Sequence, residues 1–193
     1  MKKCISLFVL LSSLLLSMPN IYGQQMIKVG EKVPGWSLED TNKKHVSLDS
    51  WKGTVLLISY VAPQYSDLND GLNDYITDAY LKKELTVDHF WAFGIVDCKS
   101  SKIPNALIRT VASRKAKKYG ATILFDYDGT LQRLWGMPKE NYTTIILDKN
   151  MVCQAVYVGE VPASEYPKVV ALIQKLSDQQ IIKSILFPLF VRF

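Results

Sequence analysis

Apolar residues follow two patterns along this chain: short continuous runs and stripes with a helical period. The runs at Val55–Val61 and at residues 89–97 are almost uninterrupted, which is typical of strands buried on both faces of a sheet. Polar turns at residues 40–43 and 148–150 separate shorter apolar pieces and predict two hairpins. The shorter strands are expected at residues 36–38, 46–48, 121–125, 143–147 and 151–158.

Three segments have the spacing of amphipathic helices: residues 66–83, 104–119 and 164–176. Ser66 and Asp67 are suited to cap the first, Pro104 fits the first turn of the second, and Gly120 ends it. Gly71 lies inside the first helix and weakens that prediction. The expected buried stripe of the first helix is Leu68, Leu72, Tyr75, Ile76, Ala79 and Tyr80. This order of elements predicts an α/β fold, a mixed central sheet flanked by helices with an N-terminal β-hairpin.

The N-terminal residues have the composition of a secretory signal peptide. Lys2 and Lys3 precede an apolar stretch at residues 4–16, and Gly23 is a suitable cleavage position. The apolar stretch is shorter than the roughly 20 residues that a membrane span needs. We therefore expect a signal peptide at 1–23, one domain at 24–178 and a periplasmic location.

The C-terminal segment, residues 179–193, is strongly apolar and is expected to form a tail. It can dock on the domain's own surface, or it can contact a partner or a membrane surface.

Charge and cysteine content exclude several classes of function. The net charge of +5 falls to +3 when Lys2 and Lys3 are removed, which is too small to indicate nucleic-acid binding. The chain has two histidines and no Cys/His cluster, so neither a metal site nor a cofactor is expected. Cys98 and Cys153 remain after cleavage and are expected at opposite ends of the sheet, as two free thiols.

Residues 125–131, FDYDGTL, support two interpretations. They match the opening motif of haloacid-dehalogenase-type phosphatases, in which Asp126 would be the nucleophile and Asp128 a general acid beside Mg²⁺. They also fit a strand that runs into a tight turn, with Gly129 where a positive φ is needed. No later pair of aspartates for Mg²⁺ follows the motif, so the turn is favoured and the phosphatase is a remote alternative.

Longer stretches resemble the redoxin branch of the thioredoxin superfamily. The segment VGEKVPGWSLEDTNKKHVSLDSWKGTVLLISYVAP is similar to the N-terminal half of periplasmic TlpA-type proteins. KKYGATILFDYDGTLQRLWG and TTIILDKNMVCQAVYVG resemble two later strand-plus-turn units of that family. The nearest likeness is to the small secreted YtfJ-type family, and the similarity covers residues 29–176. It implies a thioredoxin-like fold.

The chain departs from the TlpA-type pattern where that family carries its chemistry. The family's central strand leads into W-C-x-x-C, whose first thiol is activated by the helix that follows. An alignment without gaps places Gln64, Tyr65 and Leu68 at the tryptophan and the two cysteines, and Tyr142 at the family's cis-proline. Ordinary disulfide exchange at this position is therefore excluded.

We expect a secreted thioredoxin-fold protein that binds a protein or peptide partner in the envelope and is not an enzyme. The expected binding surface consists of Gln64, Tyr65, Ser66, Asp67 and Tyr142.

The enzymatic alternative is a single-cysteine peroxidase or thiol sensor at Cys98, where Lys99 and Lys102 could favour the thiolate. A basic helix face is expected to be solvated; its members are Arg109, Arg114, Lys115, Lys117 and Lys118.

Overall fold

The computed structural model describes residues 25–85 and 89–186, except for the side chains of Tyr119 and residues 180–186. The predicted signal peptide at 1–23 and the last residues of the predicted tail, 187–193, lie outside the described residues. No helix in the part of the chain that is described has the length and apolar character needed to cross a membrane.

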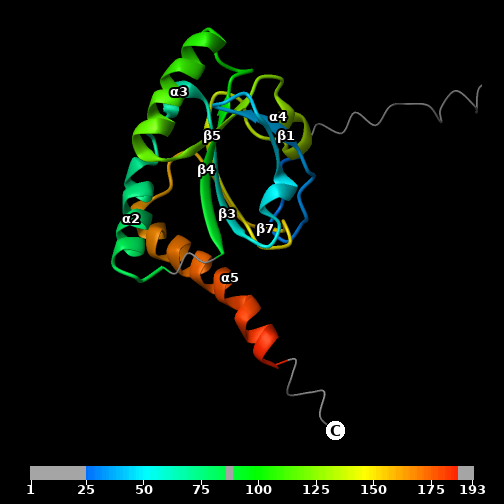
Figure 1. The fold of residues 1–193 in the computed structure, drawn as a ribbon, viewed down its shortest axis with the longest axis vertical. Helices are drawn as coiled ribbons and strands as arrows, with labels where there is room; N and C mark the ends of the chain where they lie inside the picture. Colours follow the sequence, from blue (N-terminus) through cyan, green and yellow to red (C-terminus); the bar gives the residue numbers. More distant parts are fainter. Residues whose placement is uncertain (1–24, 86–88, 187–193) are drawn as a thin grey trace, which may run out of the picture.

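Seven strands form one mixed sheet in the order β2-β1-β5-β4-β3-β6-β7 (Figure 1). β3 pairs in parallel with β4, and β4 with β5, whereas the remaining neighbours are antiparallel. The strands are β1 (Ser37–Asp40), β2 (His45–Ser47), β3 (Val55–Val61), β4 (Phe90–Asp97), β5 (Thr122–Asp126), β6 (Tyr142–Leu147) and β7 (Cys153–Val158). The predicted N-terminal hairpin, the two central strands and the mixed sheet are confirmed. β3 is buried along most of its length, whereas β4 is buried only in its second half, since Trp91 and Ala92 are exposed.

Helices cover both faces of this sheet (Figure 1). α2 (Asp70–Leu81), α3 (Asn105–Tyr119) and α5 (Tyr166–Leu186) lie on one face, and the short α4 (Thr130–Trp135) lies on the other. Alternation along β3 explains the two layers, because Val55 and Leu57 pack with α2 and α5 whereas Leu56 and Ile58 pack with α4. On the α4 side of the sheet, Trp36 contacts the rings of Trp51, Phe93 and Trp135, and Trp51 stacks on Phe93.

Three helix predictions need correction. α2 begins at Asp70 rather than at Ser66, and its Asn69 side chain bonds Gly159 and Val161 instead of capping the helix. α4 was not predicted, because six residues are too few to show a helical period. α5 does not end near residue 176 but continues to Leu186, across the expected start of the apolar tail at residue 179.

The buried stripe of α2 is narrower than predicted. Leu72, Ile76 and Ala79 are buried, whereas Tyr75 and Tyr80 are exposed. Tyr75 instead packs against Tyr166 of α5, with ring centroids 5.7 Å apart. Tyr75 therefore contacts the neighbouring helix α5 and not the sheet.

Candidate functional site

The turn that follows β3 lies at the carboxyl end of a central strand. Pro63–Tyr65 form one 3-10 turn. In this turn and the two residues after it, Gln64, Tyr65, Ser66 and Asp67 are all exposed. Ser66 Oγ donates to Asp67 at 2.9 Å, and Lys115 of α3 forms an ion pair with the same carboxylate at 2.8 Å. The bonds from Lys115 and Ser66 lower the pKa of Asp67. Ser66 and Asp67 thus link the turn to α3 and do not cap α2.

Tyr142 lies beside this turn, because it opens β6 and pairs with Val61 at the end of β3. Its side chain is only 3% exposed, and its hydroxyl donates to Ser59 Oγ at 2.9 Å. Burial raises the pKa of Tyr142. The structure therefore places the five residues of the predicted binding surface in one region, but Tyr142 forms part of a groove wall and does not project into solvent.

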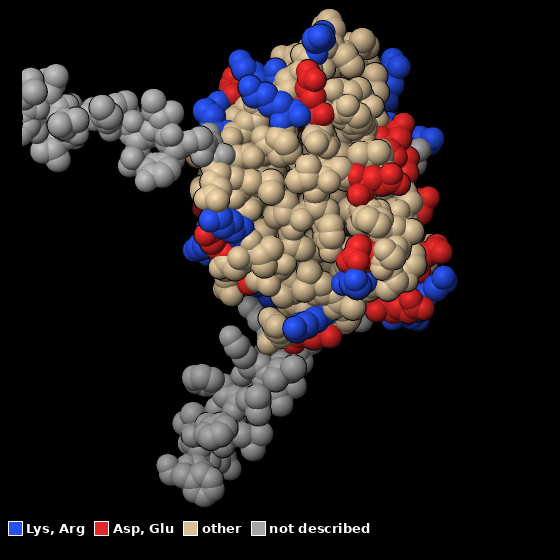
Figure 2. Space-filling model, turned by 180° about the vertical axis from the view of Figure 1, so that it is seen from behind, with Lys and Arg blue, Asp and Glu red and all other residues tan. Residues whose placement is uncertain are grey.

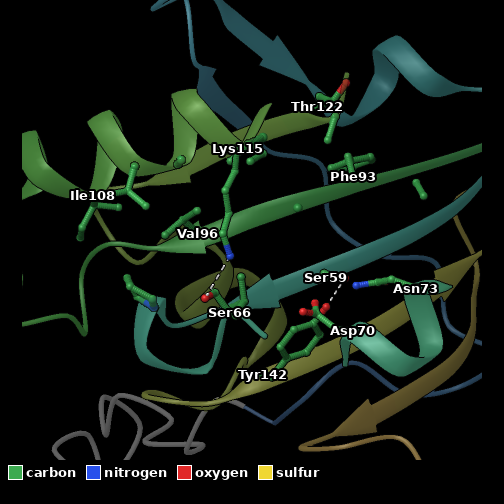
Figure 3. Close-up of a pocket in the computed structure, with 18 of the residues that line it drawn as sticks. Ser59, Ser66, Asp70, Asn73, Phe93, Val96, Ile108, Lys115, Thr122 and Tyr142 are labelled. Atoms are coloured by element: carbon green, nitrogen blue, oxygen red, sulfur yellow. Dashed lines mark hydrogen bonds between the residues drawn. The ribbon is translucent and has the colours of Figure 1, made fainter. Parts of the chain in front are cut away.

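A groove of about 840 Å³ begins at the turn and runs between α2 and α3 over the face of the sheet (Figure 3). Ser59, Val61, Ala92 and Gly94 of β3 and β4 form its floor. The wall on α3 is apolar and solvent-exposed: Leu107 is 54% exposed and Val111 48%. The wall on α2 is mostly polar: Asp70, Asn73, Asp74 and Thr77 line it, together with the buried Ile76.

The groove exists because small side chains meet on one face of two neighbouring strands. Ser59 and Gly94 are partners in the β3–β4 register, and Ala92 lies two residues from Gly94 on the same face. No large side chain fills the space between the helices there. The glycine and the serine, each inside an otherwise bulky strand, were the signal in the sequence, but their alignment depends on a register that the sequence did not reveal.

Charge is distributed unevenly around the molecule. Figure 2 shows acidic side chains gathered along one side, next to a broad surface without charged residues. α2 and the preceding turn carry four exposed carboxylates: Asp67, Asp70, Asp74 and Asp78. Basic residues are concentrated on α3, so the groove separates an acidic helix from a basic one.

The expected solvated face of α3 is correct for part of the helix only. Arg114 and Lys117 are exposed. Arg109 instead donates to Glu39 at 2.5 Å and to the Tyr127 hydroxyl at 3.0 Å, and its guanidinium lies 4.6 Å from the centre of the Phe125 ring. Arg109 therefore connects α3 to the N-terminal hairpin.

Cys98 lies under α3, away from solvent. It is 4% exposed and packs among Val96, Ile108 and Phe125. Burial, followed by the charges of Asp126 and Asp97, raises the pKa of Cys98 to about 12. The expectation that Lys99 and Lys102 would favour the thiolate is wrong, because burial and the two carboxylates raise the pKa of Cys98 more than the nearby Arg109 lowers it. Within the described residues Cys98 and Cys153 are both free, as predicted, and both are buried.

Asp126 is the last residue of β5 and is fully buried. Its Oδ1 accepts from the Thr130 amide at 2.7 Å, and its Oδ2 accepts from the Leu131 amide at 2.9 Å. Asp128 is exposed, and Gly129 has a φ of 68°. The FDYDGTL segment is thus a turn that starts a helix, as the turn interpretation predicted in part, and its first aspartate is not accessible to a phosphate ester.

A buried polar cluster that sequence reasoning missed surrounds Asp126. Asp97 is its register partner on β4, and Tyr60 donates to Asp126 Oδ2 at 3.3 Å. Gln132 of α4 donates to Asp97 Oδ1 at 2.9 Å and to Ser100 Oγ at 2.7 Å. Burial and the two carboxylates raise the pKa of Tyr60. The described residues contain no group of three His, Cys, Asp or Glu side chains that could hold a metal ion, and this cluster acts as an anchor for α4.

Comparison with known proteins identifies the fold. No family model matches the chain, and no curated protein matches it. A candidate thiol:disulfide interchange protein DsbE from Chlorobium tepidum superposes with a TM-score of 0.56 at 19% identity, over 76% of this chain and 96% of that one.

Two further solved structures agree. A DsbF homologue from Corynebacterium diphtheriae gives a TM-score of 0.54 at 21% identity, over 80% of this chain and 95% of its own. A thiol peroxidase from Chromobacterium violaceum gives a TM-score of 0.57 at 14% identity, over 78% of this chain and 88% of its own. The chain has a thioredoxin-like fold, as its sequence predicted, and its structural neighbours are redoxin proteins.

Proposed function

We propose that this is an exported, periplasmic protein that binds a protein or peptide partner and performs no dithiol exchange. The observation that carries the proposal is the open groove at the exposed turn of Gln64–Asp67, where no cysteine is present. The charged N-terminus and apolar stretch of residues 1–23 support export. Within the thioredoxin-like superfamily, the proposal places the chain nearest to the YtfJ-type family. At the positions of the CxxC cysteines and the cis-proline of TlpA-type proteins, this chain has Tyr65, Leu68 and Tyr142.

Burial of the two described thiols supports a non-catalytic role. A nucleophilic cysteine must be accessible and must be partly ionised near neutral pH. Cys98 and Cys153 are both buried, and burial raises their pKa values to about 12 and about 11. The apolar residues 179–193 would supply a second contact with the partner or with a membrane surface.

Thiol-specific crosslinking tests the proposal. The native cysteines Cys98 and Cys153 are buried and should not react, so the unaltered protein is the negative control. Gln64→Cys places a reactive thiol in the exposed turn, and Lys44→Cys places one in the exposed turn between β1 and β2. We expect the same discrete adduct from intact envelopes with Gln64→Cys, and none with Lys44→Cys or the unaltered protein. Equal adduct patterns for both variants would contradict a binding surface at the turn.

Enzyme assays can contradict the proposal in two ways. Peroxide consumption or insulin reduction that is abolished by Cys98→Ser would replace the proposal with a single-cysteine enzyme or sensor. Mg²⁺-dependent phosphate release that is lost in Asp126→Asn, under conditions where that variant is still folded, would establish the phosphatase. We expect neither activity.

A further inference from the structure

We infer that the groove between α2 and α3 binds a polypeptide segment that is apolar on one side and carries lysine or arginine on the other. This inference rests on the proposed function and specifies the chemistry of the partner. It is carried by the different character of the two groove walls.

The α3 wall and the floor favour apolar side chains. Leu107 and Val111 lie four residues apart on the same face of α3, Ile103 lies just before the helix, and all three are exposed and line the groove. The floor adds Ala92 and Gly94, which leave room for large side chains of a ligand. Covering these residues removes apolar surface from water, which is the main favourable contribution in most associations.

The α2 wall selects for positive charge. Asp70 and Asp74 line the groove and are exposed. Within the described residues, the ion pairs that involve α2, α3 or the turn before α2 are Asp67–Lys115, Asp78–Lys82 and Glu39–Arg109, and none of them includes Asp70 or Asp74. Lys115, the basic residue that lines the groove, is bound to Asp67. A cationic ligand therefore gains favourable contacts along α2, whereas an anionic ligand is repelled.

The sheet under the groove restricts how the ligand is held. β3 is paired with β4 and β6, and β4 is paired with β3 and β5, so neither strand has an open edge. Addition of a ligand strand to the sheet is excluded at this place. The ligand is held through its side chains, with its apolar groups against α3 and its basic groups against α2.

The experiment uses three fluorescein-labelled ten-residue peptides that share their leucine and phenylalanine positions. The remaining positions are lysine and arginine in one peptide, glutamine in the second and glutamate in the third. Fluorescence anisotropy with the mature full-length protein is expected to show the basic peptide binding at least about tenfold more tightly than the glutamine peptide. The glutamate peptide is expected to be the weakest.

Charge variants of α2 test the acidic wall. The double variant Asp70→Asn, Asp74→Asn is expected to weaken binding of the basic peptide by about five- to tenfold and to leave the glutamine peptide unchanged. Asp78→Asn is the matched control, since Asp78 lies on the same helix but pairs with Lys82 and does not line the groove. An equal effect of both changes would overturn the inference.

A blocking variant tests the groove itself. A Cβ at Gly94 has only the Ser59 carbonyl within 4.0 Å, so Gly94→Leu should fold and should fill the groove. We expect this variant to lose peptide binding, and Val158→Leu, at an exposed position on β7, to keep it. Leu107→Ser, at an exposed position, provides a second test and should weaken binding without affecting folding.

The outcomes separate this inference from the proposed function. Binding of the glutamine or glutamate peptide as tight as that of the basic peptide, and lost in Gly94→Leu, would overturn the charge selection and retain the binding function. An absence of binding by all three peptides, together with no adduct from Gln64→Cys, would overturn both. Binding that appears only after removal of residues 179–193 would identify the chain's own tail as the occupant and would also overturn the inference.

Discussion

Asp126 shows how a residue that looks catalytic in the sequence can have a structural role. Its two carboxylate oxygens accept hydrogen bonds from the first two backbone amides of α4 and from the Tyr60 hydroxyl, and the residue has no exposed surface. Helix amides at this position would otherwise lack partners. A carboxylate at the start of a helix is also favoured by the helix dipole.

Replacing Asp126 by asparagine should therefore destabilise the protein. The amide keeps one acceptor oxygen but turns an NH₂ group toward a region that supplies donors, so we expect a loss of about 1–3 kcal/mol in the free energy of unfolding. Urea denaturation, followed by the fluorescence of the buried Trp135 on α4, measures the loss. Asp128→Asn, at the exposed neighbouring aspartate, should stay within about 0.5 kcal/mol of the parent. Equal unfolding midpoints for the two variants would disprove the capping role.

The buried thiol of Cys98 should make the stability of the folded protein depend on pH. Folding raises its pKa from an ordinary value of 9.0 to about 12, so the fold favours the protonated thiol. This contribution to stability is complete below pH 9 and is lost as the pH rises from about 9 to about 12, where the unfolded chain has released the proton and the folded chain has not.

Thiol reagents should consequently fail to modify the native protein at pH 8, and both thiols of the mature chain should react in denaturant. Gln64→Cys provides the positive control, because its added thiol is in an exposed turn. Rapid modification of Cys98 in the folded state would show an accessible thiolate and would restore the single-cysteine alternative.

At the scale of elements, prediction succeeded where the signal is local. The apolar run at Val55–Val61 gave a strand with the same bounds, since continuous burial on both faces is recorded in the residues themselves. Prediction failed where the structure depends on contacts between residues that are far apart in the sequence. Asp67 does not cap α2 because Lys115, 48 positions away, holds its carboxylate. The groove was missed for the same reason, because it depends on the register of Ser59 with Gly94.

Gly71 in α2 is explained by another long-range contact. A Cβ at this position would lie 2.8 Å from the Tyr166 hydroxyl of α5, so glycine allows the two helices to approach each other. Gly71→Ala should gain helix propensity of up to about 1 kcal/mol only if that hydroxyl is removed.

A double-mutant cycle with Tyr166→Phe measures the effect. We expect Gly71→Ala to stabilise the Tyr166→Phe protein more than it stabilises the parent, with a coupling of at least about 0.5 kcal/mol in urea unfolding. Additive changes would mean that Tyr166 moves aside without cost, and that the glycine has no packing role.

For the whole molecule, the N-terminal hairpin is attached through a narrow connection. β1 meets the rest of the sheet at only two register pairs, Glu39 with Phe125 and Asp40 with Leu124. Arg109 strengthens this connection from α3, because its guanidinium bonds the Glu39 side chain and the carbonyls of Asp40 and Thr41. One side chain thus joins the hairpin, β5 and a helix that covers the sheet.

Arg109→Lys should weaken this connection while retaining the charge. A lysine ammonium cannot match the several directions in which the guanidinium donates, and it stacks less well on Phe125, so we expect a loss of about 1–2 kcal/mol. The loss should be concentrated in the hairpin and seen as faster hydrogen exchange in β1 and β2, with little change in β3 and β6. Arg114→Lys, at an exposed position of the same helix, should change neither the exchange rates nor the unfolding midpoint. If both variants unfold and exchange alike, the hairpin is held by its β1–β5 pairing and by the core packing of Leu38 and Val46, because the guanidinium network would then contribute no measurable stability.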